Sequence, residues 1–366
     1  MGLQCGIVGL PNVGKSTIFN ALTANEAPAE NFPFCTIEPN IGIVQIPDSR
    51  LYRIRDIFDS PKITPATVEF VDIAGLVRGA SKGEGLGNQF LSHIRKVDAI
   101  LHVVRAFSDE NVTHVDGSVN PLRDIETIDL ELIFKDMDSV KKRMGRLEKK
   151  SKAGEKEARS EMILLEKILP LLEDFQPLRS IEFSDGEKRE IHHMNLLSLK
   201  PIMFVINVNE DEILSDEHSA FSKEVENWAA GHSAGVMRLC GTIEQEISQM
   251  PIEEQFEICK DFGLPEPGLH KLIHRAYDFM GLQTFFTAGD TEAHAWTIHK
   301  GDTAQQAAGE IHTDFARGFI KAEIYHYNDI DKLGSEKAVK DAGLMHLEGR
   351  DYIVQEGDVI YFHFNV

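Results

Sequence analysis

Apolar residues in the first 105 positions, and again around residues 202–240, gather in short uninterrupted runs separated by helical or loop-like segments. Six of these runs are rich in Val and Ile: CGIVGL (5–10), IGIVQI (41–46), VEFVDI (68–73), AILHVV (99–104), IMFVIN (202–207) and GVMRLC (235–240). Runs that are apolar throughout are typical of strands buried on both faces, as in a parallel sheet covered by helices. The pattern therefore predicts an α/β domain built on a mostly parallel sheet.

The apolar spacing changes between the fourth and fifth runs. Apolar residues recur there at alternating intervals of four and three along two segments, first Ile133, Met137, Val140, Met144 and Leu147, then Ala158, Met162, Leu165, Leu169 and Leu172. Two such seams joined by the turn-like SKAGEK (151–156) predict an antiparallel helical hairpin inserted into the α/β domain. Pro170 is expected to kink or end the second arm. A capping box of Ser184 and Glu187 predicts a further short helix.

The end of the chain changes character again after GLPEPGLH (263–270) and a predicted helix reaching Met280. Residues 295–315 predict a strand, a turn and a helix, and residues 349–366 predict two strands joined by Glu-Gly-Asp. This is the pattern of a small α+β module. The predicted domains are 1–128 together with 199–280, an inserted helical domain at 129–198, and a C-terminal domain at 281–366.

Composition narrows the functional classes. The net charge of −21 argues against general DNA or RNA coating. No apolar stretch is long enough to cross a membrane, and the start of the chain has no signal-peptide pattern. Four scattered cysteines without a CxxC pair favour a reduced, cytoplasmic setting. A local basic segment remains at 135–156, with nine Lys or Arg against four acidic residues. It predicts either a solvated coiled-coil face or an RNA or ribosome contact.

The stretch GLPNVGKST (9–17) matches GxxxxGK[ST] and lies between a predicted strand and a predicted helix. In this phosphate-binding motif, glycines let successive backbone N–H groups face the phosphates, Lys15 reaches the terminal phosphates, and Ser16 offers a hydroxyl to Mg²⁺. The helix that follows directs its positive end at the same anion. The residues predicted to hold the nucleotide here are Asn12, Val13, Gly14, Lys15, Ser16 and Thr17.

A second motif is expected to complete the metal site. VEFVDIAG (68–75) is an apolar strand that ends in Asp72-x-x-Gly75. Asp72 is predicted to hold Mg²⁺, and Gly75 to offer its N–H to the γ-phosphate during catalysis. Thr36, in NFPFCTIEPN (31–40), is the predicted second hydroxyl ligand of the metal.

The residue after Gly75 departs from the usual pattern. Many GTPases place Gln there to orient the attacking water, whereas this chain has Leu76, which can neither donate nor accept a hydrogen bond. Either hydrolysis is slow or another group orients the water. His114 is the favoured candidate and His93 the weaker one, and a structural or surface histidine is the alternative for each.

These motifs together resemble the Obg-like ATPase (YchF) family of P-loop NTPases, in the family's order and over essentially the whole chain. The resemblance implies a helical insertion, a C-terminal TGS domain with an ubiquitin-like fold, and a Mg²⁺-dependent hydrolase that prefers ATP and associates with ribosomes. Leu76 fits a family trait of a hydrophobic residue in place of Gln. Asn12 matches an asparagine that helps bind K⁺ in related GTPases, so K⁺ stimulation is a hypothesis.

The run IMFVIN leads into Asn207-Val208-Asn209-Glu210, where guanine-selective proteins carry Asn-Lys-x-Asp. The Asp of that motif accepts hydrogen bonds from guanine N1–H and the 2-amino group, and the Lys stem packs along the base. Glu210 is longer than Asp, and Val208 cannot cover the base as Lys does. Asn207 can still address the adenine edge, so ATP is the expected preference. Cys240 and Gly241 are predicted to form the remaining loop beside the base.

The sequence therefore predicts a P-loop switch protein that hydrolyses ATP slowly by itself, is stimulated by a partner and associates with ribosomes, with the basic hairpin 135–156 and the TGS domain as candidate contacts. Two alternatives stay open. One is an ordinary GTPase. The other is a nucleotide-gated ribosome- or RNA-binding protein in which hydrolysis is incidental.

Overall fold

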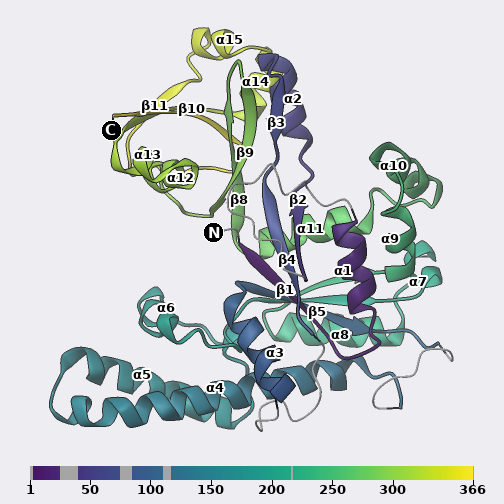
Figure 1. The fold of residues 1–366 in the computed structure, drawn as a ribbon, viewed down its shortest axis with the longest axis vertical. Coiled ribbons are helices and arrows are strands. Elements are labelled where there is room, and N and C mark those ends of the chain that lie inside the picture. Colours follow the sequence, from purple (N-terminus) through teal and green to yellow (C-terminus); the bar gives the residue numbers. More distant parts are fainter. Residues whose placement is uncertain (1–2, 25–39, 75–84, 110–116, 216, 366) are drawn as a thin grey trace. The chain divides into compact units, whose positions relative to one another are not determined.

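The computed structural model describes residues 3–24, 40–74, 85–109, 117–215 and 217–365 (Figure 1). The chain folds into two units. Unit 1 comprises residues 1–42 and 69–272, and unit 2 comprises residues 43–68 and 273–366. The domain boundaries expected from the sequence remain a prediction. The two units divide the chain differently: residues 43–68 join the C-terminal part, that part begins at Ile273, and residues 129–198 stay within unit 1.

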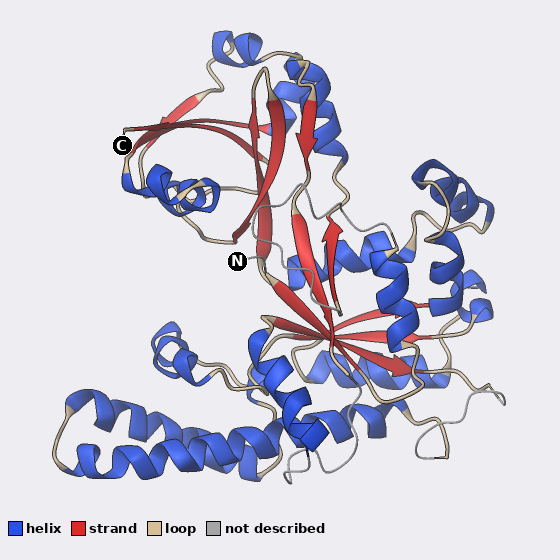
Figure 2. Cartoon of the chain, in the orientation of Figure 1, coloured by secondary structure: helices blue, strands red, loops and turns tan. Residues whose placement is uncertain are grey.

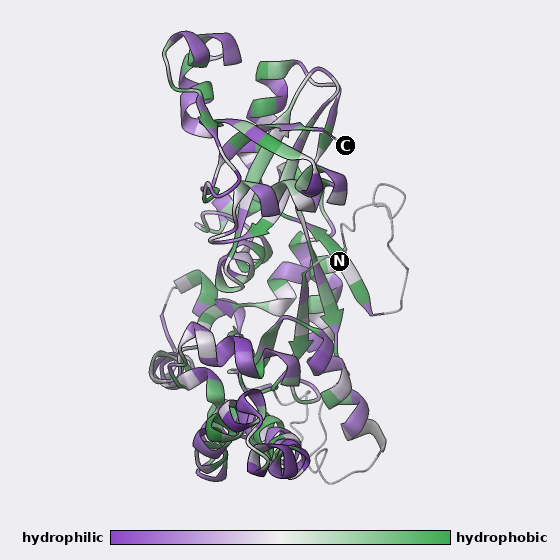
Figure 3. Cartoon of the chain, turned by 90° about the vertical axis from the view of Figure 1, so that its left-hand side faces the viewer, coloured by the Kyte–Doolittle hydropathy of each residue, from purple (hydrophilic) through white to green (hydrophobic). Residues whose placement is uncertain are grey.

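The first six-stranded sheet has the order β2-β4-β1-β5-β6-β7, and its strands β1, β5, β6 and β7 lie wholly in unit 1. The strands span Gln4–Val8 (β1), Ile41–Gln45 (β2), Thr67–Asp72 (β4), Ala99–Arg105 (β5), Ile202–Asn207 (β6) and Gly235–Leu239 (β7). β1 pairs in parallel with both β4 and β5, and β5, β6 and β7 continue the parallel arrangement. All six predicted runs are confirmed as strands. β5 and β6 are buried along their full lengths, which is why their sequences carry no alternation. Figure 3 shows the chain coloured by hydropathy, with apolar residues in green.

Helices connect these strands (Figure 2). They are α1 (Lys15–Thr23), α3 (Gly85–Lys96), α7 (Glu210–Ser215), α8 (Ala220–Gly231), α9 (Gly241–Ile247), α10 (Ile252–Asp261) and α11 (Gly268–Phe279). Because β1 and β4 are parallel neighbours, with Ile7 opposite Asp72, the loop after β1 and the end of β4 meet at one edge of the sheet. This edge positions the candidate site.

The helical hairpin is confirmed: α4 (Pro121–Lys152) and α5 (Lys156–Glu173) lie antiparallel and side by side (Figure 1). Both predicted seams contribute to one apolar cluster, in which Val140, Leu165 and Leu172 are fully buried. Pro170 does not end α5, which continues to Glu173. The capping box at Ser184 and Glu187 is also confirmed and begins α6 (Asp185–Ile191).

Buried polar contacts fix the base of the hairpin. The carboxylate of Asp136 accepts hydrogen bonds from the backbone N–H groups of Leu197 (2.8 Å) and Ser198 (2.7 Å). Arg179, in the short 3-10 helix η3 (Leu178–Ser180), forms a buried ion pair with Asp129 at 2.6 Å. A second 3-10 helix, η4 (His192–Met194), follows α6.

Unit 2 holds the second sheet, in the order β11-β10-β12-β8-β9-β3. Its strands are β3 (Lys62–Thr64), β8 (Leu282–Ala288), β9 (Glu292–His299), β10 (Phe319–His326), β11 (His346–Glu348) and β12 (Asp358–Phe364). Its helices are α2 (Ser49–Phe58), α12 (Ala304–Ile311), α13 (Thr313–Arg317), α14 (Tyr327–Leu333) and α15 (Glu336–Asp341). The expected strand, turn and helix at 295–315 are present.

The prediction of two strands over residues 349–366 is wrong for the first of them. Only β12 forms, and Ile353 makes a single isolated bridge to Thr303. The neighbouring backbone groups are already used, since Val354 N–H donates to the Asp302 carbonyl (3.1 Å) and Ala304 N–H donates to the Tyr352 carbonyl (2.8 Å). The segment therefore closes over the start of α12 instead of extending a sheet.

Candidate functional site

The loop between β1 and α1 has the geometry of a phosphate cradle. Asn12 and Gly14 adopt left-handed backbone conformations, with φ of 63° and 94°. A side chain on Gly9 would approach the Val103 carbonyl to 2.8 Å, so glycine is required where the loop passes over β5. Val13 is buried and holds the loop to the core. The N-terminus of α1 then begins at Lys15, in the position where backbone N–H groups bind an anion.

Lys15 and Asp72 meet beside this loop as an ion pair. Their side chains are only 11% and 18% exposed, so the pair is shielded from water. The Asp72 carboxylate holds the Lys15 ammonium near the place where the motif predicts terminal phosphates. Two of the residues predicted from separate motifs are therefore brought together.

The residues present suit Mg²⁺. Asp72 supplies a carboxylate oxygen at the edge of the sheet, and Ser16 follows Lys15 with an exposed hydroxyl. Among the described residues, no group of three or more His, Cys, Asp or Glu side chains could hold a metal on protein ligands alone. Mg²⁺ in phosphate-binding sites takes one or two protein oxygens and completes its shell with water and phosphate oxygens, which matches this donor set.

Asn207 ties the cradle to the loop that follows β7. Its side chain is 5% exposed; Nδ2 donates to the Val13 carbonyl at 2.9 Å, and Oδ1 accepts from the Gly241 N–H at 3.0 Å. A methyl group on Gly14 would overlap Nδ2. The sequence predicts that this asparagine addresses the base, and the structure shows that it also ties the phosphate loop to the loop at Cys240 and Gly241. These two contacts leave one amide hydrogen and one acceptor lone pair of the side chain unused.

The other predicted base-side residues differ in accessibility. Val208 is 1% exposed, and its backbone N–H donates to the Leu239 carbonyl at 2.9 Å. Its side chain therefore belongs to the core and cannot cover a base. Glu210 is exposed at the start of α7. Cys240 is the N-cap residue of α9, and burial raises the pKa of its thiol.

Several predicted residues lie outside the described part of the chain: Thr36, Gly75, Leu76 and His114. Their roles stay predictions. The weaker candidate for orienting water, His93, is exposed on α3.

Sequence reasoning missed two buried charged residues near this edge of the sheet. Arg105, at the end of β5, is 1% exposed and donates to the carbonyls of Phe107 (3.0 Å) and Asp109 (3.3 Å), which orders the backbone after the strand. Glu244, one turn into α9, is 4% exposed. The burial of Arg105 could have been predicted from its position in an apolar run. No feature of the neighbouring sequence predicts that Glu244 is buried.

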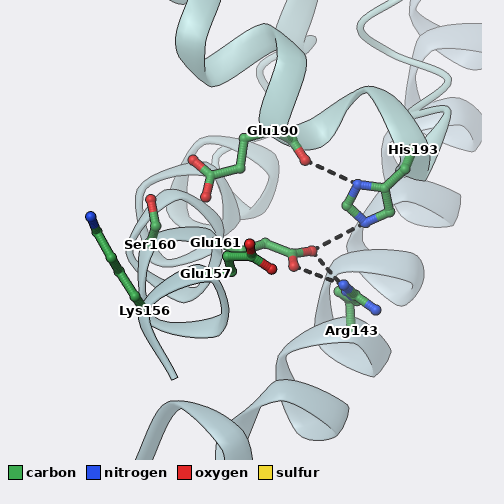
Figure 4. Close-up of a pocket in the computed structure, with 7 residues that line it drawn as sticks. All are labelled: Arg143, Lys156, Glu157, Ser160, Glu161, Glu190 and His193. Atoms are coloured by element: carbon green, nitrogen blue, oxygen red, sulfur yellow. Dashed lines mark hydrogen bonds and ion pairs between the residues drawn. The ribbon is translucent and has the colours of Figure 1, made fainter. Parts of the chain in front are cut away.

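A cavity of about 570 Å³ lies elsewhere, in the helical hairpin region (Figure 4). It is lined by Arg143, Lys156, Glu157, Ser160, Glu161, Glu190 and His193. Arg143 and His193 converge on Glu161, with Arg143 making two contacts of 2.7 Å and His193 one of 3.2 Å. The Glu161 carboxylate is already paired with Arg143 and His193, and no glycine-rich loop lines the cavity. The cavity is therefore not the nucleotide site.

No helix in the described residues is both long and apolar enough to cross a membrane.

Comparisons with known proteins agree with this geometry. The N-terminal part, residues 4–136, matches the family model MMR_HSR1, described as a 50S ribosome-binding GTPase. Residues 282–365 match YchF-GTPase_C, described as a protein of unknown function.

Full-length relatives are similar throughout. The chain is 50% identical over 366 residues to proteins named ribosome-binding ATPase YchF from Bacillus subtilis (strain 168) and Escherichia coli O157:H7, covering 100% of each chain in both cases. A solved structure titled as the Schizosaccharomyces pombe YchF GTPase superposes with a TM-score of 0.88 at 37% identity, covering 99% of this chain and 98% of that one. The P-loop, the helical insertion and the C-terminal unit therefore have one explanation: the chain belongs to the YchF family of P-loop NTPases.

Proposed function

We propose that this P-loop NTPase is a cytoplasmic, Mg²⁺-dependent ATPase that prefers ATP over GTP and acts as a nucleotide-controlled switch on the ribosome. The observation that carries the proposal is the braced cradle: the phosphate loop, the Lys15–Asp72 pair and Asn207 converge at one edge of the sheet. The curated relatives are named ribosome-binding ATPases, which supports both the activity and the partner.

Lys15 changes partner in the proposed reaction. When a triphosphate enters the cradle, the ammonium exchanges Asp72 for phosphate oxygens, where it offsets the charge that develops as water attacks the γ-phosphate. Asp72, released from Lys15, would then hold Mg²⁺ together with Ser16 and Thr36. When bound, Mg²⁺ supplies charge neutralisation at the phosphates. Gly75 would donate its N–H to the γ-phosphate, and His114 would orient the attacking water.

The base preference rests on what the loop after β6 lacks. Val208 is buried, so no side chain at the usual lysine position covers the base. Glu210 replaces the Asp that pairs with guanine, and adenine offers a carboxylate neither an N1–H nor a 2-amino group. A site without the matched guanine contact loses most of its discrimination in favour of GTP. Asn207 retains one N–H and one lone pair for the adenine edge.

The names of similar proteins disagree on which nucleotide is hydrolysed. The curated relatives are called ATPases, whereas the S. pombe structure and the N-terminal family model are called GTPases. An ordinary GTPase is therefore the second candidate. Equilibrium titration with ATP and GTP in the presence of Mg²⁺ distinguishes the two. Replacing K⁺ by Na⁺ in the same assay tests the proposed K⁺ site at Asn12, and unchanged turnover would remove it.

Part of the basic hairpin is available for ribosomal RNA. Several of its cations are paired with acidic side chains, as in Lys141–Glu173 and Lys152–Glu148. Lys142, Arg146 and Lys149 are exposed at intervals of four and three, so they share one face of α4. This stripe supports phosphate contact at the hairpin, and the TGS domain is the second proposed contact.

Cosedimentation with ribosomes tests the stripe. Charge reversal of these three residues is expected to weaken binding most at low salt, whereas Lys152→Glu is the control because that residue is already paired. Lys15→Ala tests the alternative that the protein acts by binding ribosomes and that hydrolysis is incidental. A variant that still bound ribosomes and restored function in cells would favour a binding protein whose hydrolysis is incidental.

A further inference from the structure

Glu244 joins the loop beside the base to another helix. Its carboxylate accepts two backbone hydrogen bonds at the start of α11, from Gly268 N–H to Oε1 and from Leu269 N–H to Oε2, each 3.0 Å long. These are the free amides of a helix N-terminus, which favour a negative charge. The side chain is 4% exposed, so the contact is inside the protein.

The start of α11 also packs closely against the residue that precedes the base-side loop. A methyl group on Gly268 would overlap the Glu244 carboxylate and come within 2.9 Å of Leu239 Cδ1. Leu239 ends β7 immediately before Cys240 and Gly241, and Glu244 lies one turn after them, with its N–H bonded to the Cys240 carbonyl at 3.0 Å. Helix α11 therefore supports this loop on both sides.

The opposite side of the loop faces the nucleotide cradle. Gly241 N–H donates to Asn207 Oδ1 at 3.0 Å, and a side chain at Gly241 would lie 3.5 Å from the Thr17 methyl group of α1. The loop is thus held between the cradle and α11. Burying a carboxylate here has a cost, since desolvation raises the pKa of Glu244 to about 7. A neutral apolar residue would avoid that cost but could not accept the two hydrogen bonds from α11.

We propose that Glu244 is a positioning residue for nucleoside recognition: by anchoring α9 to the N-terminus of α11, it fixes the loop of Cys240 and Gly241 at the base. The proposal rests on the proposed function, because it takes the ligand to be a nucleoside triphosphate. The two hydrogen bonds of the Glu244 carboxylate go to α11 and not to the phosphate loop. Loss of Glu244 therefore weakens the grip on the base and ribose and leaves the grip on the phosphates unchanged.

Two ligands separate these effects: ATP, and inorganic tripolyphosphate, which has no base. Affinities for both are measured with Mg²⁺ for the full chain and for Glu244→Ala, Glu244→Gln and Gly268→Ala. The last variant breaks the same contact from the side of α11. Glu246→Gln is the matched control, because Glu246 is exposed on the same helix. Gly145→Ala is the second control, because a methyl group there has open space. Circular dichroism establishes that each variant is folded.

The proposal predicts that Glu244→Ala and Gly268→Ala weaken ATP binding about tenfold and change tripolyphosphate binding by less than about twofold. Glu244→Gln, which keeps one acceptor oxygen, should fall between wild type and Glu244→Ala. Equal losses for both ligands would show that Glu244 only stabilises the fold, and unchanged ATP binding in Gly268→Ala would also overturn the proposal. If the wild type prefers GTP, the base preference fails, and the same comparison made with GTP still tests Glu244.

Discussion

Replacing Asn207 by alanine removes both hydrogen bonds that brace the nucleotide cradle. The amide donates to the Val13 carbonyl at 2.9 Å and accepts from the Gly241 N–H at 3.0 Å, and the side chain is 5% exposed. Each bond contributes roughly 1 kcal/mol net, and a buried partner left unpaired costs roughly 1–3 kcal/mol. We therefore expect the free energy of unfolding to fall by about 2–4 kcal/mol.

Nucleotide affinity is expected to fall as well, because two loops that are held in place in the wild type would have to be ordered by the ligand. A loss of about tenfold or more in ATP affinity follows. Urea unfolding followed by circular dichroism measures the stability, and isothermal titration calorimetry with Mg²⁺ and ATP measures the affinity.

Asn209→Asp is the matched control. Asn209 is exposed two residues further along, and its Oδ1 accepts from the Glu212 N–H at 3.1 Å, a role that a carboxylate oxygen fills equally well. This variant should stay within about 0.5 kcal/mol of wild type. If Asn207→Ala matched the control in both unfolding midpoint and ATP affinity, the bracing role would be refuted.

Three further predictions follow from the buried groups. Lys15→Ala should abolish measurable ATP and tripolyphosphate binding in the same titration, and retained tripolyphosphate affinity would exclude Lys15 from the phosphate site. Burial raises the pKa of Glu244 in the folded protein to about 7 from its ordinary value of 4.5, so between these pH values the folded protein keeps a proton that the unfolded chain loses. The stability that this proton provides, roughly 3 kcal/mol at most, is complete below about pH 4.5 and is lost as pH rises through about 7. When the free energy of unfolding in urea is plotted against pH, Glu244→Gln should show a smaller decrease over this range. An unchanged decrease would contradict the raised pKa of Glu244. Leu165→Ala should cost about 3 kcal/mol by opening a cavity in the hairpin core, whereas Ile163→Ala, at a side chain 60% exposed on the same helix, should cost less than about 0.5 kcal/mol; equal unfolding midpoints would contradict the packing.

Local patterns were sufficient for the strands of the parallel sheet, the helical hairpin and the phosphate loop. The heptads predicted the hairpin because each seam is a property of neighbouring turns of helix, and continuous apolar runs indicated the buried strands. Lys15 and Asp72 were predicted from motifs at the ends of two strands, and parallel pairing explains why they meet.

Long-range pairing was beyond the sequence. Residues 43–68 join unit 2, where β3 pairs in parallel with β9 through Lys62 opposite Glu292, more than two hundred positions away. Nothing in a three-residue strand identifies such a partner. The same reason explains the missing strand near Ile353, whose neighbours bond to residues 302–304 instead.

Side chains whose partners lie in distant segments were also incompletely predicted. Asn207 was predicted to contact the base because its position in the motif is recognisable, but its bonds to Val13 and Gly241 depend on how three segments fold together. Glu244 was not singled out, since a glutamate on a short helix is ordinarily exposed. Its burial is a property of α11, which begins 24 positions further on.

The most direct test of the account is the pair of dissociation constants for ATP and GTP, measured on the full chain with saturating Mg²⁺. With Val208 buried and Glu210 in place of the guanine-binding Asp, the account predicts tighter binding of ATP, by about tenfold. A protein that bound GTP a hundredfold more tightly than ATP, a difference of about 2.7 kcal/mol, would contradict it.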